Sequence, residues 1–144
     1  MTPAVVPGTS GRPGPVWIDI PKDVQAATIE LDALPEPGAR TAPPTFDSAS
    51  VREAAAMINA AQRPVLYLGG GVINAPEQIR QLAEKANLPT TQTLMALGML
   101  PKAHPLSLGM LGMHGTYEAN MTMQHCDVLL AVGARFDDRV IGNP

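Results

Sequence analysis

The sequence predicts an α/β fold with a partial doubly wound parallel sheet, preceded by a terminal strand of another domain and a linker. Residues 64–68 and 127–132 are short apolar runs of the kind that form parallel strands buried on both faces. Segments with helical spacing separate these runs, and glycines follow both of them. This order of strand, turn and helix is expected of β-α-β units.

The first part of the chain does not fit that pattern. Residues 16–20 read Val-Trp-Ile-Asp-Ile and predict a strand that ends at Pro21. Since a lone strand cannot satisfy its backbone groups, we expect it to be the last strand of a sheet whose other members are absent, or else an added edge strand. The first alternative is preferred and makes the chain a fragment. The proline-rich stretch that follows indicates a linker.

The predicted organisation is therefore residues 1–23 as the end of one domain, 24–47 as an interdomain linker and 48–144 as a truncated main domain. Ser50 and Glu53 fit a capping box that opens the first helix, which would end before Pro64. The other elements expected after residue 63 are strands at 64–68, 90–94 and 127–132, helices at 76–87 and 116–126, a glycine turn at 69–71 and a loop at 96–112.

Composition excludes several classes of function. The 144 residues suffice for one ordinary core, and a net charge of −3 without a basic block argues against a nucleic-acid partner. One cysteine cannot form a disulfide framework, and residues 1–14 lack the features of a signal peptide. No apolar run reaches the roughly 20 residues needed to cross a bilayer. We expect a cytoplasmic protein without a membrane partner.

Glycines follow the strand at residues 64–68. Gly69, Gly70 and Gly71 leave backbone N–H groups open to a phosphate near the start of a helix. They match neither the G-x-G-x-x-G pattern nor a P-loop with its lysine. A purely structural turn is the alternative.

Charged residues follow the strand at 127–132. Arg135 and Arg139 could bind a phosphate or carboxylate through the planar guanidinium, while Asp137 and Asp138 could accept hydrogen bonds from hydroxyl groups. The alternative is a loop of surface ion pairs. The position at the carboxyl end of a strand favours ligand binding.

His114 lies between Gly112 and Gly115, which would let the backbone pass close to a flat ligand. Met113 in the same loop is a candidate for lining a site, although methionines more often fill cores. The three histidines and Cys126 lack metal-ligand or Cys-His spacing, so a zinc site and a catalytic cysteine are rejected.

Four stretches together resemble thiamine-diphosphate enzymes. Residues 10–23 are similar to the end of their pyrimidine-binding domain, and residues 63–74 to the first strand and turn of their Rossmann-like central domain. Residues 108–115, which read Leu-Gly-Met-Leu-Gly-Met-His-Gly, and residues 133–139, which read Gly-Ala-Arg-Phe-Asp-Asp-Arg, resemble the acetohydroxyacid synthase (acetolactate synthase) large catalytic subunits in particular. Glyoxylate carboligase, which shares only the first two stretches, is the alternative.

The resemblance implies a central domain that binds FAD without net redox chemistry. It implies that Arg139 recognises the substrate carboxylate and that Met113 lines the substrate approach. The residues implied to contact the flavin nucleotide are Gly69, Gly70, Gly71, Thr93, Leu94, Met95, Leu111, Gly112, Met113, His114, Gly133, Ala134, Arg135 and Asp137.

The reaction implied by the resemblance is decarboxylation of pyruvate on thiamine diphosphate and transfer of the two-carbon unit to pyruvate or 2-oxobutanoate, which begins isoleucine and valine synthesis. Thiamine diphosphate and Mg²⁺ would be held by domains outside this chain, and we expect no metal ligands within it. We therefore expect the chain alone to be inactive. The full-length enzyme is expected to be a homodimer or tetramer, with or without a small regulatory subunit. A free-standing nucleotide-binding module remains the other alternative.

Overall fold

The computed structural model describes residues 14–33, 45–137 and 140. The chain divides into two units, Met1–Phe46 and Asp47–Pro144, and each is described by itself. Residues 10–13 of the first resembling stretch, the linker prolines Pro35, Pro37, Pro43 and Pro44, and residues 138–139 lie outside the described residues. The domain boundaries proposed from the sequence remain predictions.

The strand predicted at residues 16–20 is wrong. Residues 14–21 have no regular secondary structure, and the described part of the first unit offers them no strand to pair with. A short helix, α2 (Lys22–Ala26), follows Pro21, and the Gln25 side-chain amide donates to the carbonyl of Ile20 at 2.6 Å. β-branched composition alone did not make a strand, because a strand requires a partner.

The second unit begins with helix α3 (Ser48–Ala60). Its N-cap is Asp47, whose carboxylate accepts from the amides of Ala49 and Ser50 at 3.0 Å each and from the Ser50 hydroxyl at 2.7 Å. The capping box predicted at Ser50 is therefore wrong, and Ser50 lies inside the first turn. Asp and Ser cap about equally well, and Asp47 supplies two acceptor oxygens instead of one.

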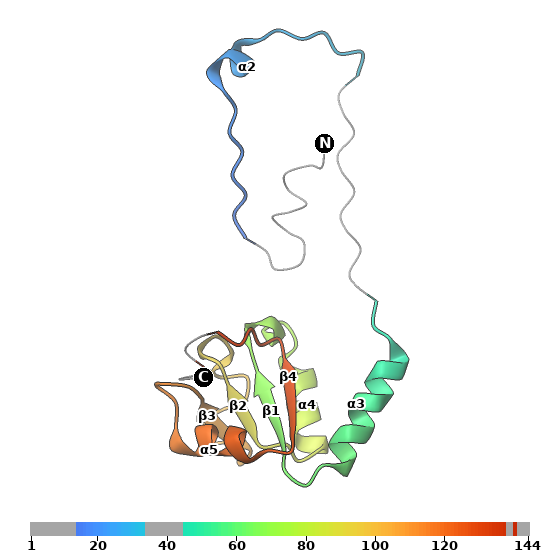
Figure 1. Ribbon diagram of the computed structural model, residues 1–144, viewed down its shortest axis with the longest axis vertical. Helices are drawn as coiled ribbons and strands as arrows, with labels where there is room; N and C mark the ends of the chain where they lie inside the picture. Colours follow the sequence, from blue (N-terminus) through green and yellow to red (C-terminus); the bar gives the residue numbers. More distant parts are fainter. Residues whose placement is uncertain (1–13, 34–44, 138–139, 141–144) are drawn as a thin grey trace. The chain divides into compact units, whose positions relative to one another are not determined.

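Four parallel strands form the sheet, in the order β3-β2-β1-β4 (Figure 1). They are β1 (Pro64–Leu68), β2 (Thr90–Gln92), β3 (Ser107–Met110) and β4 (Val128–Val132). Helix α4 (Pro76–Lys85) joins β1 to β2, and helix α5 (Tyr117–His125) joins β3 to β4. The predicted parallel α/β fold is confirmed.

The prediction from the sequence did not include β3, and it placed the end of β2 too late in the chain. The predicted strand at residues 90–94 ends at Gln92, and a 3-10 turn, η2 (Leu94–Ala96), follows. β3 lies in the predicted loop at residues 96–112, where Gly109 has a φ of +81° and the register with β2 shifts. A strand with an irregular glycine has no clear alternation, and pairing with β2 rather than local composition forms it.

β1 divides the core into two layers because its side chains alternate between the faces of the sheet. Leu66 and Leu68 pack with Ile79 and Ala83 of α4 in the larger cluster. Tyr67 packs on the other face with residues that include Ala119 of α5. Helices α4 and α5 therefore cover opposite faces, which is the doubly wound arrangement.

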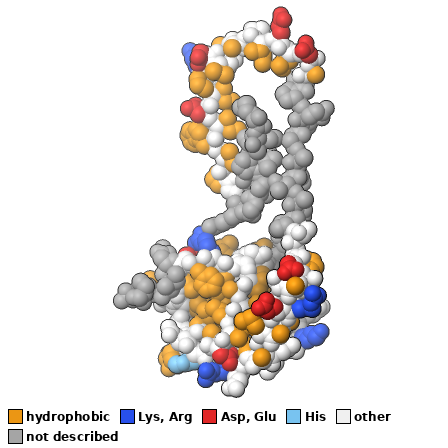
Figure 2. Space-filling model, turned by 45° about the vertical axis from the view of Figure 1, so that its right-hand side comes forward, with side chains coloured by type: hydrophobic (Ala, Val, Ile, Leu, Met, Phe, Trp, Pro, Cys, Tyr) orange, Lys and Arg blue, Asp and Glu red, His pale blue; other side chains and the backbone are white. Residues whose placement is uncertain are grey.

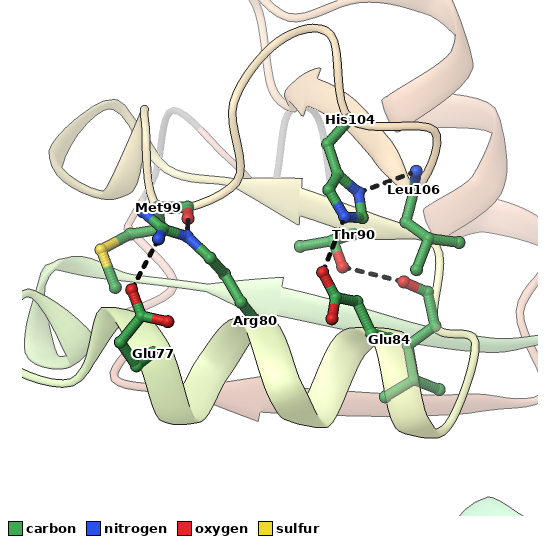
Figure 3. Close-up of polar contacts among 8 residues, drawn as sticks. Glu77, Arg80, Glu84, Thr90, Met99, His104 and Leu106 are labelled. Atoms are coloured by element: carbon green, nitrogen blue, oxygen red, sulfur yellow. Dashed lines mark hydrogen bonds and ion pairs between the residues drawn. The ribbon is translucent and has the colours of Figure 1, made fainter.

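The long connection between β2 and β3 is fastened to α4 by polar contacts (Figure 3). Arg80 donates to the carbonyl of Met99 at 3.1 Å and pairs with Glu77 at 2.8 Å. His104 lies 3.3 Å from the Glu84 carboxylate. These contacts stabilise a connection that contains no helix longer than one turn in the described residues.

Several large apolar side chains of the second unit remain exposed. Figure 2 shows hydrophobic side chains among charged residues on one face of this unit. Val51 and Met57 on α3 are each 55% exposed, and Leu129 on β4 is 36% exposed. Within the described residues β4 pairs only with β1, so it is an edge strand of the sheet.

Candidate functional site

The strand ends define one row of loops. In the sheet register Leu68 pairs with Val132 and with Gln92, and Gln92 pairs with Met110. The first residues after these four strands, in sheet order, are Leu111, Thr93, Gly69 and Gly133. With a strand spacing of about 4.8 Å, the row spans roughly 14 Å. All four loops predicted to form the site begin in this row.

The order in which strands are added to the sheet reverses between β1 and β4. From β1 it runs to β2 and β3 on one side, and it returns to place β4 on the other side. Ligands of open α/β sheets bind at such a switch point, at the carboxyl ends of the strands. The glycine loops after β1 and β4 therefore occupy the expected position of a ligand crevice.

These two glycine loops are in direct backbone contact. The amide of Gly69 donates to the carbonyl of Val132 at 2.9 Å, and the amide of Gly71 donates to that of Gly133 at 3.0 Å. A Cβ on Gly69 would lie 2.1 Å from the Gly133 oxygen, and a Cβ on Gly71 would lie 2.8 Å from the Gly133 Cα. The absence of side chains at Gly69 and Gly71 is thus required by the packing of the protein itself.

Gly70 differs from its neighbours. A Cβ there would meet only the Met95 side chain, at 3.0 Å. Gly70 begins the 3-10 turn η1 (Gly70–Val72), which leads toward α4. The alternative of a purely structural turn therefore accounts for Gly69 and Gly71. It does not account for Gly70, which lies beside the loop after β2.

The loop after β2 contains an unsatisfied polar atom. The amide of Thr93 donates to the carbonyl of Leu68 at 2.8 Å, while its hydroxyl is buried and has no hydrogen-bond partner among the described residues. The next two side chains, Leu94 and Met95, are 71% and 69% exposed. A buried hydroxyl beside exposed apolar side chains is the surface expected where a partly apolar ligand binds.

The loop after β3 is held by α5. The Asn120 side chain accepts from the amide of Gly112 at 2.8 Å and donates to its carbonyl at 3.1 Å. Leu111 is buried, whereas Met113 is 75% exposed and His114 is also exposed. Met113 is therefore not a core residue. This loop is separated from the glycine loops by β2, so a ligand that contacted both would have to be extended.

The loop after β4 carries the charged groups. Arg135 and Asp137 form an ion pair of 2.8 Å, with side chains that are 59% and 37% exposed. Gly133 and Phe136 both have positive φ values, +64° and +56°. Arg139 and Asp138 lie outside the described residues, so the roles predicted for them remain predictions.

Tyr67 was not predicted as a site residue. Its ring meets that of Phe136 edge to face, with centroids 5.2 Å apart, and its hydroxyl is buried without a partner in the described part of the chain. Burial raises the pKa of Tyr67 above its ordinary value of 10.0, and the negative charge of Asp137 raises it further. A tyrosine inside an otherwise aliphatic strand was the available signal.

A separate groove lies at the opposite, amino-terminal edge of the strands. It contains none of the predicted site residues. The residues that line it are Gln62, Arg63, Pro64, Val65, Ala86, Asn87, Pro89, Met121, Thr122, His125 and Cys126. We place the candidate site at the carboxyl edge, because the strand register points there and the edge carries the Arg135 guanidinium and the hydroxyls of Tyr67 and Thr93, which have no hydrogen-bond partner in the described ranges.

The described residues contain no group of three or more His, Cys, Asp or Glu side chains arranged to hold a metal ion. None of their helices combines the length and the apolar character required to cross a bilayer.

The fold and the row of loops define a doubly wound α/β domain whose candidate site lies at the switch point of its sheet. Residues 51–144 match the family described as "Thiamine pyrophosphate enzyme, central domain". The chain belongs to this family of thiamine pyrophosphate enzymes.

Three relatives named as acetolactate synthase subunits are similar to the chain. The chain is 69% identical to the acetolactate synthase isozyme 1 large subunit of Escherichia coli over 92% of its own length and 24% of the relative's. It is 46% identical to the mitochondrial acetolactate synthase catalytic subunit of Saccharomyces cerevisiae, covering 94% and 21% of the two chains. A probable acetolactate synthase large subunit of Methanocaldococcus jannaschii is 47% identical, with 94% and 24% covered.

The chain thus spans about a quarter of the length of these relatives. Their names agree with the resemblance to acetolactate synthase large subunits. They do not favour the glyoxylate carboligase alternative.

Proposed function

We propose that this chain forms the central, flavin-nucleotide-binding region of an acetolactate synthase large subunit. The observation that carries the proposal is the alignment of four loops at one edge of the sheet, each beginning directly after a strand. The names of the relatives support the same assignment. A row of loops roughly 14 Å long suits an extended dinucleotide better than a small metabolite.

FAD is the proposed ligand, and the described residues fit it in three respects. The Thr93 hydroxyl is buried and has no hydrogen-bond partner within the part of the chain that the structure describes. Leu94, Met95 and Met113 expose apolar surface that a flavin ring or an adenine could cover. Arg135 offers an exposed guanidinium for a pyrophosphate. In this proposal FAD is held without net redox chemistry.

Arg135 and Asp137 have complementary roles in this proposal. The guanidinium would donate to anionic oxygens of the ligand, and the carboxylate would accept from a ligand hydroxyl. Since the two groups now pair with each other, ligand binding would separate them. The exposure of both side chains keeps the cost of separating them small.

The remaining assignments concern the whole enzyme. We propose pyruvate and 2-oxobutanoate as substrates, with the substrate carboxylate bound by Arg139 and the approach lined by Met113. Thiamine diphosphate, with Mg²⁺, would supply the carbanion chemistry in domains other than this one. A homodimer or tetramer, a regulatory subunit and a cytoplasmic location are proposed on the same resemblance.

Binding of FAD to the full 144-residue chain tests the main proposal. Calorimetric titration should give saturable binding to the wild type, and Arg135→Ala should weaken it about tenfold or more. Arg80→Ala is the matched control, because Arg80 is engaged with Glu77 and Met99 away from the crevice. Absence of saturable binding, or equal loss in both variants, would contradict the proposal.

Enzyme activity is tested separately. With pyruvate, thiamine diphosphate, Mg²⁺ and FAD supplied, we expect the purified chain to make no acetolactate above a protein-free control. Acetolactate formation by the chain would show that the assignment of thiamine binding to other domains is wrong. Saturable FAD binding together with a cooperative thermal transition would also be expected of a free-standing nucleotide-binding module.

A further inference from the structure

The hydroxyl of Tyr67 is the least explained polar group in the second unit. The residue is 0% exposed, and its neighbours in the core include Leu111 and Ala119. The hydroxyl finds no hydrogen-bond partner among the described residues. A phenylalanine would fill the same space without burying an unpaired donor, so packing alone does not account for a tyrosine here.

A candidate partner comes from the loop after β4, which contacts the Tyr67 ring. The ring of Phe136 rests edge-on against the Tyr67 ring, with centroids 5.2 Å apart. Asp137 is the next residue, and its charge contributes to the raised pKa of Tyr67. The carboxylate is therefore within electrostatic reach of the phenol, although no hydrogen bond joins them.

The loop between these residues contains a backbone conformation that is uncommon for a side-chain-bearing residue. Phe136 has a φ of +56°, which non-glycine residues adopt only when their surroundings impose it. On one side of it Arg135 holds Asp137 at 2.8 Å, in contact with solvent. An anion bound by Arg135 would compete with Asp137 for the guanidinium and repel its carboxylate.

We propose that Tyr67 is a positioning residue of the crevice: when an anionic nucleotide engages Arg135, the buried Tyr67 hydroxyl donates a hydrogen bond to the Asp137 carboxylate. Ligand binding thus replaces the Arg135 guanidinium with the Tyr67 hydroxyl as a partner of Asp137. The Tyr67 hydroxyl gains its hydrogen-bond acceptor only in the bound state. This hydrogen bond between Tyr67 and Asp137 thereby holds the loop at residues 133–137 in its binding conformation. This inference rests on the proposed function.

Tyr67→Phe in the full chain separates this role from a structural one. Without ligand, the variant should unfold at a temperature equal to or above that of the wild type, since it removes a buried unpaired hydroxyl. Its affinity for FAD should fall about tenfold, the effect of losing a hydrogen bond to a charged acceptor. In an Asp137→Ala background the same substitution should have no further effect on affinity.

Tyr117→Phe provides the matched control. Tyr117 is 74% exposed on α5, and the chain has only two tyrosines. The variant should bind FAD as the wild type does, and its tyrosine absorbance then reports on Tyr67 alone. Inorganic pyrophosphate, which does not absorb in this range, should shift that absorbance to longer wavelength as the phenol donates to a carboxylate.

Three outcomes would overturn the proposal. They are unchanged FAD and pyrophosphate affinity in Tyr67→Phe, a full effect of Tyr67→Phe in the Asp137→Ala background, and failure of both probes to bind the wild type. Coupling of Tyr67 and Asp137 with pyrophosphate, but no FAD binding, would support the role of Tyr67 and overturn the flavin assignment instead.

Discussion

The amide of Gly71 donates to the carbonyl of Gly133 across 3.0 Å, joining two loops that lie 62 positions apart in the chain. A second bond, from Gly69 to the carbonyl of Val132, runs beside it at 2.9 Å. The two loops at the switch point are therefore joined by backbone contact, and they tolerate side chains only where that contact is absent.

Gly69→Ala is expected to destabilise the second unit by more than about 2 kcal/mol, because its Cβ would overlap the Gly133 carbonyl and neither backbone can withdraw. Gly70→Ala is the matched control and should cost about 1 kcal/mol or less, since its Cβ meets only the exposed Met95 side chain. Urea denaturation measures both. Equal losses would show that the contact between the loops is not required for folding.

Asp127 is expected to make stability depend on acid pH. Its carboxylate accepts from the amide of Gln62 at 2.7 Å and from that of Arg63 at 2.9 Å, which lowers the pKa of Asp127 below its ordinary 3.8. The ionised form therefore stabilises the fold fully above about pH 4, and this contribution is lost as the pH falls through the lower folded-state pKa.

The measurement for Asp127 is the difference in melting temperature between the wild type and Asp127→Asn. The difference should be present at pH 7 and shrink below pH 3.8. Asp47, whose pKa is also lowered, chiefly by the Ser50 hydroxyl, is present in both proteins and cancels. A difference that stays constant down to pH 2 would contradict the prediction.

Gln92→Leu should destabilise the unit by about 1–3 kcal/mol, although it places an apolar residue in a buried position. Gln92 accepts from the amide of Leu100 at 3.2 Å and donates to its carbonyl at 3.3 Å, so the substitution leaves both groups unpaired. Gln81→Leu, on the exposed side of α4, should stay within about 0.5 kcal/mol. Chemical denaturation of both variants tests this, and a stabilised Gln92→Leu would disprove it.

Arg135→Lys should bind FAD more weakly than the wild type but more tightly than Arg135→Ala, because lysine keeps the charge and loses the planar fork. Since Arg135 is 59% exposed, wild-type affinity should also fall as salt is added. Calorimetry at two salt concentrations measures both effects. Equal affinity of the Lys and Ala variants would argue that Arg135 does not bind an anion.

Local patterns predicted the elements that local chemistry controls. The strands at Pro64–Leu68 and Val128–Val132, and the helix that begins at Pro76, were all predicted, because apolar runs and helix-start signals act over a few residues. The pairing of strands that are far apart in the chain could not be predicted from such local patterns. β3 was missed and a strand at residues 16–20 was wrongly predicted, since a strand exists only where another lies beside it.

The sequence by itself determined the family of this protein, because its motifs resemble those of acetohydroxyacid synthase subunits, and that resemblance implied the four groups of residues proposed to form the site. The tertiary structure decided what those residues do for the fold. The register placed Gly69, Thr93, Leu111 and Gly133 in one row, and backbone contact explained Gly69 and Gly71 without a ligand. Only packing could bury the Tyr67 hydroxyl without a hydrogen-bond partner among the described residues, beside the loop that carries Arg135 and Asp137, because burial depends on contacts distant in sequence.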